Sequence, residues 1–164
     1  MKKGYGLGFK RKRIGKTNYK KRLKLLLSNK PRLVIRKSIN NVLAQVVQYD
    51  AKGDKVIVSA HSSELKKYGW DSSKKNLCAA YLVGLLIGGK AKKKDIKEVI
   101  VDIGLQKSVK GSKIYSLIKG CVDKGLIVPC SKEIFPSEDR IKGKHIKDFD
   151  TNKFEEIKKK LMGV

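Results

Sequence analysis

The 164-residue chain has no acidic residue before Asp50. Its first 49 residues carry 15 Lys and Arg, whereas the remaining 115 carry 25 basic and 15 acidic residues. The formal net charge of the whole chain is +25. An excess of this size, concentrated in one part of the chain, is typical of a partner such as a nucleic acid or an anionic membrane. The alternative is a basic, solvated face with no partner, and the self-repulsion of so much charge argues against it.

Cysteines, histidines and long apolar runs are also scarce. Cys78, Cys121 and Cys130 have no CxxC spacing, and the first two read as small buried hydrophobes, which suits a reducing cytoplasm. The two histidines have no cysteine at ligand spacing, which argues against a zinc site. The longest apolar stretch, 77–87, is too short to cross a bilayer, and no apolar run follows the charged N-terminus. We therefore expect a cytoplasmic protein with no membrane contact, metal, cofactor or small-molecule substrate.

Motifs for catalysis are weak. Gly84-x4-Gly89-Lys90 imitates a phosphate-binding P-loop, but it lies in an apolar helix pattern, and an alanine stands where a magnesium-binding Ser or Thr is needed. No nucleophile-elbow motif supports a Ser-His-Asp site, although counting residues does not exclude one. A nuclease would need clustered carboxylates, for which Asp50, Asp54 and Asp102 are the candidates near strands. Neither a helix-turn-helix nor an aromatic RNA-recognition strand is apparent.

Residues 10–22 form the most basic segment of the chain. Eight of these thirteen residues are Lys or Arg, and none is acidic. Such a segment buries too little apolar surface to offset its ordering entropy, so we expect it to be mobile when alone. It predicts a basic N-terminal arm that needs a dense polyanion, and RNA is the partner we favour.

Hydrophobic periodicity predicts an α/β body behind this arm. A helix is expected from about Asn18 to Ser28, with Tyr19 and three leucines on one face. Three strands, at 32–37, 42–49 and 55–60, are joined by hairpin-sized turns and predict an antiparallel three-strand meander. Arg32 and Arg36 share one strand face, either as a basic surface or as the solvated side of an edge strand. These elements are long enough in sum to enclose one core.

The second half of the chain adds a crossover to this meander. A short helix at 63–67 and a helix hydrophobic nearly all round at 77–91 precede a short strand at 99–103, which should lie parallel to one strand of the meander. Glycines in the long helix could allow close packing on the sheet. A further helix begins after Ser112, residues 126–150 read as an ordered loop or tail, and an amphipathic helix covers 150–160. The fold class is therefore α/β, with a mixed four-strand sheet, packed helices and a basic N-terminal arm.

Several motifs carry a family resemblance. They are Gly15-Lys16-Thr17-Asn18-Tyr19-x-x-Arg22, Lys30-Pro31-Arg32-Leu33-Val34-Ile35-Arg36, Ser59-Ala60-His61-Ser62-Ser63-Glu64-Leu65, Tyr68-Gly69-Trp70, Ala79-Ala80-Tyr81-Leu82-x-Gly84, Asp102-Ile103-Gly104-Leu105, Lys110-Gly111-Ser112 and Ile134-Phe135-Pro136-Ser137-Glu138-Asp139-Arg140-Ile141-x-Gly143. In this order they resemble the archaeal and eukaryotic branch of the large-subunit ribosomal protein family that binds 5S ribosomal RNA, number eighteen in the universal naming. The similarity covers residues 10–147.

The resemblance implies a structural protein of the large ribosomal subunit. Its implied partners are 5S ribosomal RNA, large-subunit ribosomal RNA and neighbouring ribosomal proteins. The RNA-binding residues carried over are Lys10, Arg11, Arg13, Lys16, Thr17, Asn18, Tyr19 and Arg22, with Arg32 and Arg36 added from the sheet. Charge alone adds Lys107, Lys110 and Lys113 from a loop. Tyr19 could stack on an unpaired base, although packing beside Leu23 is the alternative.

Two departures from the family pattern and two rival functions remain. Asn18 stands where the family usually has Asp, and the chain ends soon after Lys160, without the long extension of eukaryotic members, which favours an archaeal type.

We expect three parts: the arm at 1–22, an α/β RNA-binding domain at 23–125 and a C-terminal loop and helix at 126–164. The rivals are a general structured-RNA binder or chaperone, and an RNA-processing nuclease.

Overall fold

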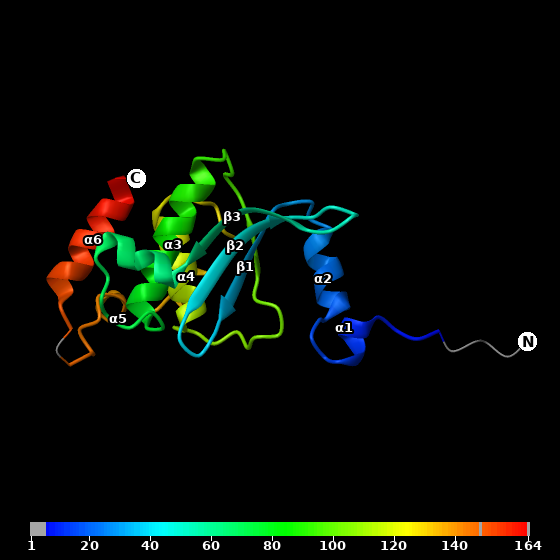
Figure 1. Ribbon diagram of the computed structural model, residues 1–164, viewed down its shortest axis with the longest axis horizontal. Coiled ribbons are helices and arrows are strands. Elements are labelled where there is room, and N and C mark those ends of the chain that lie inside the picture. The colour runs from blue at the N-terminus through cyan, green and yellow to red at the C-terminus, as the bar shows by residue number, and fades with distance from the viewer. Residues whose placement is uncertain (1–5, 148, 164) are drawn as a thin grey trace, which may run out of the picture.

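A four-stranded mixed sheet forms one layer of the body (Figure 1). In this computed structural model, which describes residues 6–147 and 149–163, the strands are β1 (Arg32–Lys37), β2 (Val42–Gln48), β3 (Lys55–His61) and β4 (Ile100–Asp102). They lie in the order β3-β2-β1-β4, antiparallel from β1 through β3 and parallel between β1 and β4. The predicted meander with a fourth, parallel strand is confirmed.

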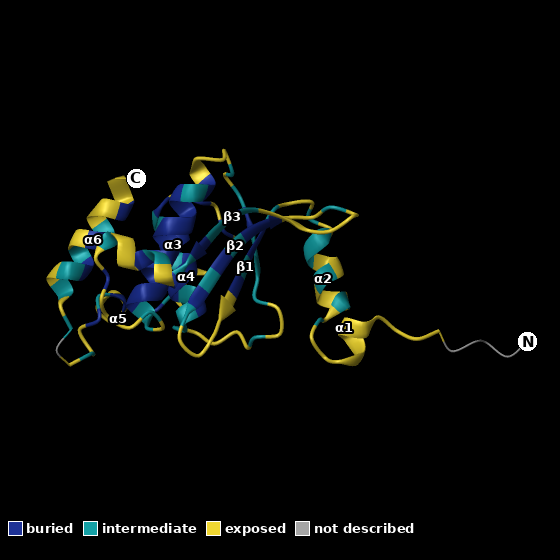
Figure 2. Ribbon diagram, in the orientation of Figure 1, coloured by how far each residue is buried: buried dark blue, intermediate teal, exposed yellow. Residues whose placement is uncertain are grey.

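The crossover between β3 and β4 contains the most buried helix of the chain. The 3-10 helix η1 (Ser62–Tyr68) starts with a reciprocal cap, in which the carboxylate of Glu64 accepts from the His61 N–H. The α-helix α3 (Leu77–Lys92) is capped by Asn76, whose side chain accepts from the Ala79 N–H at 2.7 Å. Because α3 is apolar on every side, it lies between the sheet and the helices α4 (Lys113–Asp123) and α6 (Thr151–Gly163), as Figure 2 shows by its burial.

Glycines in α3 face a different neighbour from the one the sequence suggested. A Cβ placed on Gly84 would lie 2.1 Å from the carbonyl oxygen of Leu117 in α4, and one on Gly120 would lie 2.3 Å from that of Tyr81 in α3. The expectation that these glycines bring α3 close to the sheet is therefore wrong for Gly84, which lets α3 and α4 meet backbone to backbone.

The C-terminal part of the chain joins the same core. Residues 126–150, expected as a loop, include the short helices η2 (Lys132–Ile134) and α5 (Glu138–Ile141), with an isolated bridge from Ile127 to Glu98. The helix α6 matches the predicted amphipathic helix and buries Phe154, Ile157 and Leu161. The division of the chain at residues 22 and 125 stays a prediction.

The arm projects from the opposite end of the body from α6 (Figure 1). It contains one helical turn, α1 (Lys10–Arg13), which the sequence did not suggest, and it runs into α2 (Tyr19–Leu26). No residue of α2 is buried, and Leu23 and Leu27 are 61% and 73% exposed. Leu23 and Leu27 of the predicted apolar face are thus exposed, while Tyr19 and Leu26 are half-buried. Tyr19 contacts Phe9 rather than the core, so the alternative of core packing beside Leu23 is wrong. Among the described helices, none combines the length and apolarity needed to cross a membrane.

Candidate nucleic-acid interface

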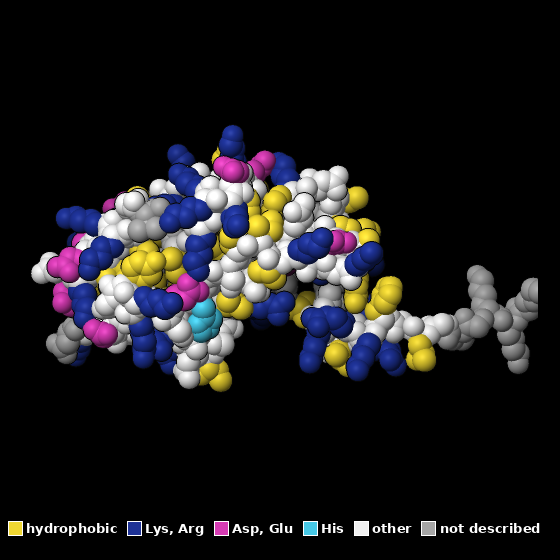
Figure 3. Space-filling view, turned by 45° about the horizontal axis from the view of Figure 1, so that its top comes forward, with side chains coloured by type: hydrophobic (Ala, Val, Ile, Leu, Met, Phe, Trp, Pro, Cys, Tyr) yellow, Lys and Arg dark blue, Asp and Glu magenta, His cyan; other side chains and the backbone are white. Residues whose placement is uncertain are grey.

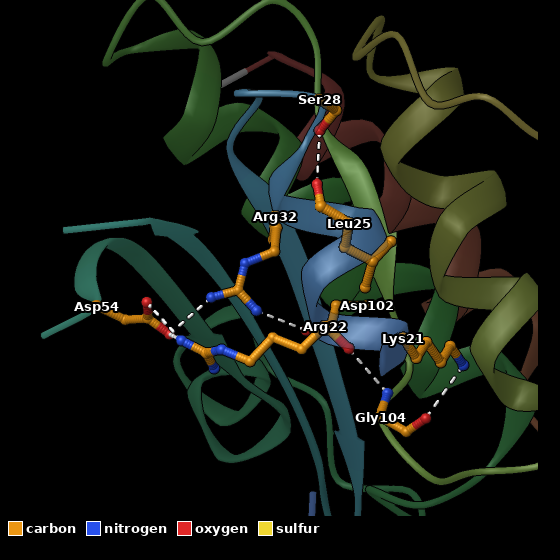
Figure 4. A network of polar contacts seen from close by, with 8 residues as sticks. All are labelled: Lys21, Arg22, Leu25, Ser28, Arg32, Asp54, Asp102 and Gly104. Atoms are coloured by element: carbon orange, nitrogen blue, oxygen red, sulfur yellow. Dashed lines mark hydrogen bonds and ion pairs between the residues drawn. The ribbon is translucent and has the colours of Figure 1, made fainter. Parts of the chain in front are cut away.

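Polar side chains fasten α2 to the body. Arg22 donates from Nη2 to both carboxylate oxygens of Asp54, at 2.9 and 2.8 Å, and Asp54 lies in the turn between β2 and β3. On the same side of α2, the ammonium of Lys21 donates to the carbonyl oxygen of Gly104, after β4, at 3.1 Å. Figure 4 shows that these anchors reach two separate parts of the body. The helix is therefore held at a fixed place by two long-range contacts.

Arg32 joins these anchors into one network. Its Nη2 donates to Asp54 at 2.6 Å and its Nη1 to Asp102 at 2.7 Å, while Asp102 also accepts from the Gly104 N–H at 2.9 Å (Figure 4). The Arg32 side chain is 3% exposed. Burying a charge without partners is costly, so the two aspartates are what allow an arginine at this position in β1. The same Asp54 holds Arg22, and the ion pair between Arg32 and Asp54 thus sets the place of the arm.

A groove of about 740 Å³ lies between the arm and β1 and β4. Its polar lining comes from the arm and from the sheet edge, and its apolar lining comes from both as well. The residues that line it are Arg11, Lys16, Thr17, Asn18, Tyr19, Lys21, Arg22, Leu25, Val34, Ile35, Arg36, Asp102, Ile103, Gly104, Leu105 and Gln106. Charged, hydrogen-bonding and aromatic groups are therefore available to one ligand in the groove.

The tip of the arm is folded back by local contacts. Arg11 donates from Nε to the Thr17 hydroxyl at 2.9 Å, and the Lys16 N–H donates to the Arg11 carbonyl oxygen at 2.9 Å. Gly15 between them has φ +64°, a conformation that favours glycine. The rings of Phe9 and Tyr19 lie 5.0 Å apart at an interplanar angle of 31°. This pair gives the arm an aromatic surface beside its cations.

The structure brings most of the predicted RNA-binding residues together. Seven line the groove, namely Arg11, Lys16, Thr17, Asn18, Tyr19, Arg22 and Arg36. Lys10 and Arg13 are exposed on α1 beside it, and dark blue side chains follow the arm in Figure 3. Asn18 uses its side-chain oxygen to cap α2, accepting from the Lys21 N–H at 3.0 Å.

Four predicted residues lie apart from the groove. Arg32 is buried within the ion-pair network, so it has almost no surface to offer a ligand. Lys107 and Lys110 belong to the segment between β4 and α4, Lys113 is the first residue of α4, and none of the three lines the groove. Whether these four contact RNA stays a prediction.

Sequence reasoning missed nine of the residues that line the groove, namely Lys21, Leu25, Val34, Ile35, Asp102, Ile103, Gly104, Leu105 and Gln106. Gln106 donates from its side chain to the carbonyl oxygens of Ile35 and Ile103, at 2.7 and 3.1 Å, and so fixes the loop that forms one wall. The spacing of Asn18, Lys21, Arg22 and Leu25 places them on one face of a helix, and all but Leu25 are polar. A search for apolar faces could not have found it.

The carboxylates considered for a nuclease have a different role. Asp54 and Asp102 both face Arg32, and Asp50 pairs with Lys55 at 2.8 Å. Over residues 6–147 and 149–163, no three His, Cys, Asp or Glu side chains gather as a metal-binding group. These aspartates hold cations of the protein itself.

A cationic arm above a groove with aromatic and hydrogen-bonding groups defines a class of proteins that bind polyanions. Residues 3–97 match the family model described as ribosomal large subunit proteins 60S L5 and 50S L18. The large ribosomal subunit protein uL18 of the archaeon Methanococcus maripaludis is 50% identical over 149 residues, which cover 91% of this chain and 77% of that protein. The chain belongs to this family of large-subunit ribosomal proteins.

Membership of the family settles several expectations. The chain is a structural constituent of the large ribosomal subunit and not an enzyme, which removes the nuclease alternative. Its partners include ribosomal RNA and other ribosomal proteins, and its place is the cytoplasmic ribosome. The similarity to an archaeal relative agrees with the archaeal type inferred from the sequence.

Proposed function

We propose that the chain binds 5S ribosomal RNA with its arm and groove, and thereby helps attach that RNA to the large-subunit ribosomal RNA at the central protuberance. One observation carries the proposal. The two anchors, Arg22 to Asp54 and Lys21 to Gly104, hold an arm rich in exposed cations above a groove whose other wall is the sheet. The family's ribosomal role supplies an RNA partner, and the sequence resemblance points to 5S RNA.

Different side chains of the arm have different roles in RNA recognition. Arg11, Arg13 and Lys16 are exposed and can neutralise phosphates, which releases counterions and gives affinity. Tyr19, stacked against Phe9, offers a ring to an unpaired base, which folded RNA presents and a regular duplex does not. Phosphate contacts fix position, whereas contacts to bases and RNA shape give selectivity.

Arg22 and Arg32 act differently from the other predicted residues. Both donate to Asp54, so their first role is to place the arm on the body. The Arg22 side chain is 34% exposed and can contact a phosphate while it remains bound to Asp54. The Arg32 side chain is 3% exposed and cannot. We therefore assign Arg32 to positioning and not to direct contact.

Competition between RNAs tests the proposal. Labelled 5S RNA is bound to the protein at ~150 mM salt, near physiological ionic strength, and challenged with unlabelled 5S RNA or transfer RNA. We expect 5S RNA to compete at much lower concentration than transfer RNA. Equal competition by the two RNAs would instead favour the general structured-RNA binder or chaperone.

Neutral substitutions test the role of the arm without removing its anchors. In the triple variant R11Q/R13Q/K16Q, the slope of log affinity against log salt should fall by roughly 2–3, at about 0.7–0.9 for each lost phosphate contact. The variant K66Q/K67Q/K75Q removes three exposed cations elsewhere and is the matched control. Deleting residues 1–22 is less sharp, because it also removes Arg22 from Asp54. An unchanged salt slope in the arm variant would show that the arm does not bind.

A further inference from the structure

A second concentration of positive charge lies where α3, α4 and α6 end, away from the arm. We call it the lysine hollow, and it is lined by Gly89, Lys92, Lys93, Asp123, Lys124, Met162 and Gly163. Its volume is about 450 Å³. Figure 1 shows the C-terminal ends of α3 and α6 apart from α2. The hollow and the groove have no lining residue in common.

The deepest lysine of the hollow is built into the fold. Lys124 is 8% exposed and donates from Nζ to the carbonyl oxygens of Leu161 and Met162, at 2.8 and 3.0 Å. A Cβ on Gly88 would lie 2.9 Å from the Cβ of Lys124, and one on Gly89 would lie 3.2 Å from its Cε. The two glycines thus make room for the lysine stem, and its ammonium ends the last turn of α6.

Lys92 and Lys93 add charge that the described part of the chain does not neutralise. Neither has a described carboxylate within ion-pair distance, and the one acid of the hollow, Asp123, already accepts from Lys119 at 2.9 Å and from the Tyr81 hydroxyl at 2.8 Å. Burial lowers the pKa of Lys124, and the nearby charges of Lys92 and Lys93 lower it further. The three ammonium groups therefore repel one another, and although the C-terminal ends of the helices offset part of this repulsion, an anion between the lysines would relieve it further.

The chemistry of the lining indicates what kind of anion fits. The hollow offers lysines and glycine backbone, with no aromatic ring to stack on a base and no arginine fork to read one. Lysines of this kind neutralise phosphates without selecting sequence. Lys94 and Lys97 follow along the chain and are exposed, with one exposed acid, Asp95, between them.

We propose that the lysine hollow is a second RNA-binding site, which takes the phosphate backbone of a ribosomal RNA segment other than the one in the groove. The chain then holds two RNA segments at two separate places on its surface. This inference rests on the family's ribosomal RNA partner and not on which RNA occupies the groove. It gives a physical means by which a small protein could join one ribosomal RNA segment to another.

The first test isolates the hollow from the arm. In the full-length protein carrying R11Q/R13Q/K16Q, the binding of deproteinised large-subunit ribosomal RNA is measured with and without the additional pair K92Q/K93Q. We expect that pair to weaken binding by about fivefold or more at low salt, since two phosphate contacts are lost. The control pair K66Q/K67Q, which removes two adjacent exposed lysines of η1, should change it less than about twofold.

The second test asks for two RNAs at once. Immobilised 5S RNA is loaded with protein that has an intact arm, and the capture of labelled large-subunit ribosomal RNA is then measured. The pair K92Q/K93Q should leave the loading on 5S RNA unchanged and reduce the second capture. Equal capture by K92Q/K93Q and wild type in both tests, or an equal loss in the K66Q/K67Q control, would overturn the proposal.

Other outcomes separate the two proposals and the two classes of partner. Weak loading on 5S RNA by wild type would count against the groove proposal, while the first test would still measure the hollow. If K92Q/K93Q lost binding to polyglutamate but not to ribosomal RNA, the hollow would be a site for an acidic protein, and the RNA assignment would be wrong.

Discussion

The contact between Gly84 and Gly120 makes a sharp prediction about stability. In a Gly84→Ala variant the new methyl group would lie 2.1 Å from the carbonyl oxygen of Leu117 and 3.0 Å from the Cα of Gly120. Both obstacles are backbone atoms within α4, so a side-chain rotation cannot relieve the overlap. The two helices must separate, and the core between them must loosen.

The size of the effect follows from two opposing terms. Alanine is favoured over glycine inside a helix by about 1 kcal/mol. Overpacking a core costs typically 1–3 kcal/mol, and more where the backbone has to move. We therefore expect Gly84→Ala to lower the free energy of unfolding by a net of about 2 kcal/mol, which is the upper end of that cost less the gain from alanine. For a chain of this length, a loss of that size lowers the melting temperature by roughly 4–8 °C.

Urea unfolding followed by the fluorescence of Trp70 provides the measurement. Trp70 is the only tryptophan and is 2% exposed, so its emission reports loss of the core. Gly88→Ala should cost less, because the atom it meets at 2.9 Å belongs to the side chain of Lys124. Gly163→Ala, where nothing lies within 4 Å, is the matched control and should be nearly neutral.

Two results would refute this reasoning. One is an unfolding midpoint of Gly84→Ala equal to that of wild type. The other is a loss in Gly163→Ala as large as that in Gly84→Ala, since it would show that the substitution acts through something other than the helix contact. If Gly84→Ala does not fold at all, the smaller loss expected for Gly88→Ala still allows the order of the series to be measured.

Three further predictions concern the anchors, the pH dependence and the thiols. Asp54→Asn should lower the free energy of unfolding by about 1–2 kcal/mol, which is less than for a fully buried pair. The substitution should also speed hydrogen exchange in α2 but not in α3. Unchanged exchange in α2 would contradict the anchor formed with Arg22. Burial raises the pKa of Glu64, but the Lys90 ammonium and a backbone N–H outweigh this and lower the pKa overall. The ionised carboxylate therefore stabilises the fold above its ordinary pKa of 4.5, and this stabilisation is lost as the pH falls below that value. Urea midpoints between pH 3 and 6 should therefore fall less steeply in Glu64→Gln, and parallel curves would count against this. Burial raises the pKa of all three thiols, and only Cys130 is partly exposed. One thiol should therefore react with a chromogenic disulfide reagent at pH 8 in the folded protein, and three should react in urea. Fast reaction of two or more thiols in the folded protein would contradict the burial of Cys78 and Cys121.

Periodicity was sufficient to predict most of the fold. The alternation in β1 and the unbroken apolar character of α3 each indicate which side of an element meets the core. The crossover rule then predicts that β4 is parallel to one strand of the meander, and the structure shows that this strand is β1. The boundaries of β2, β3, α3 and β4 differ from the predicted ones by a residue or two, as helix and strand ends commonly do.

Periodicity failed where polar contacts decide the packing. An amphipathic pattern assumes that the apolar face is the buried one, but α2 is held by Lys21 and Arg22 and turns Leu23 outward. Arg32 and Arg36 alternate on the same strand face and look equivalent in sequence. Only Arg32 is buried, because Asp54 and Asp102, 22 and 70 residues away along the chain, come to it in the fold.

The use of the few acidic residues explains how this protein remains folded and still cationic. Asp54 and Asp102 meet at the base of the arm, and Glu64 and Asp123 each hold a lysine on the body. No acidic residue precedes Asp50, so nothing in the arm itself competes with RNA for its cations. The acidic residues therefore fix the base of the arm and leave the cations along the rest of the arm without ion-pair partners. A polyanion can bind these cations without first displacing the protein's own ion pairs.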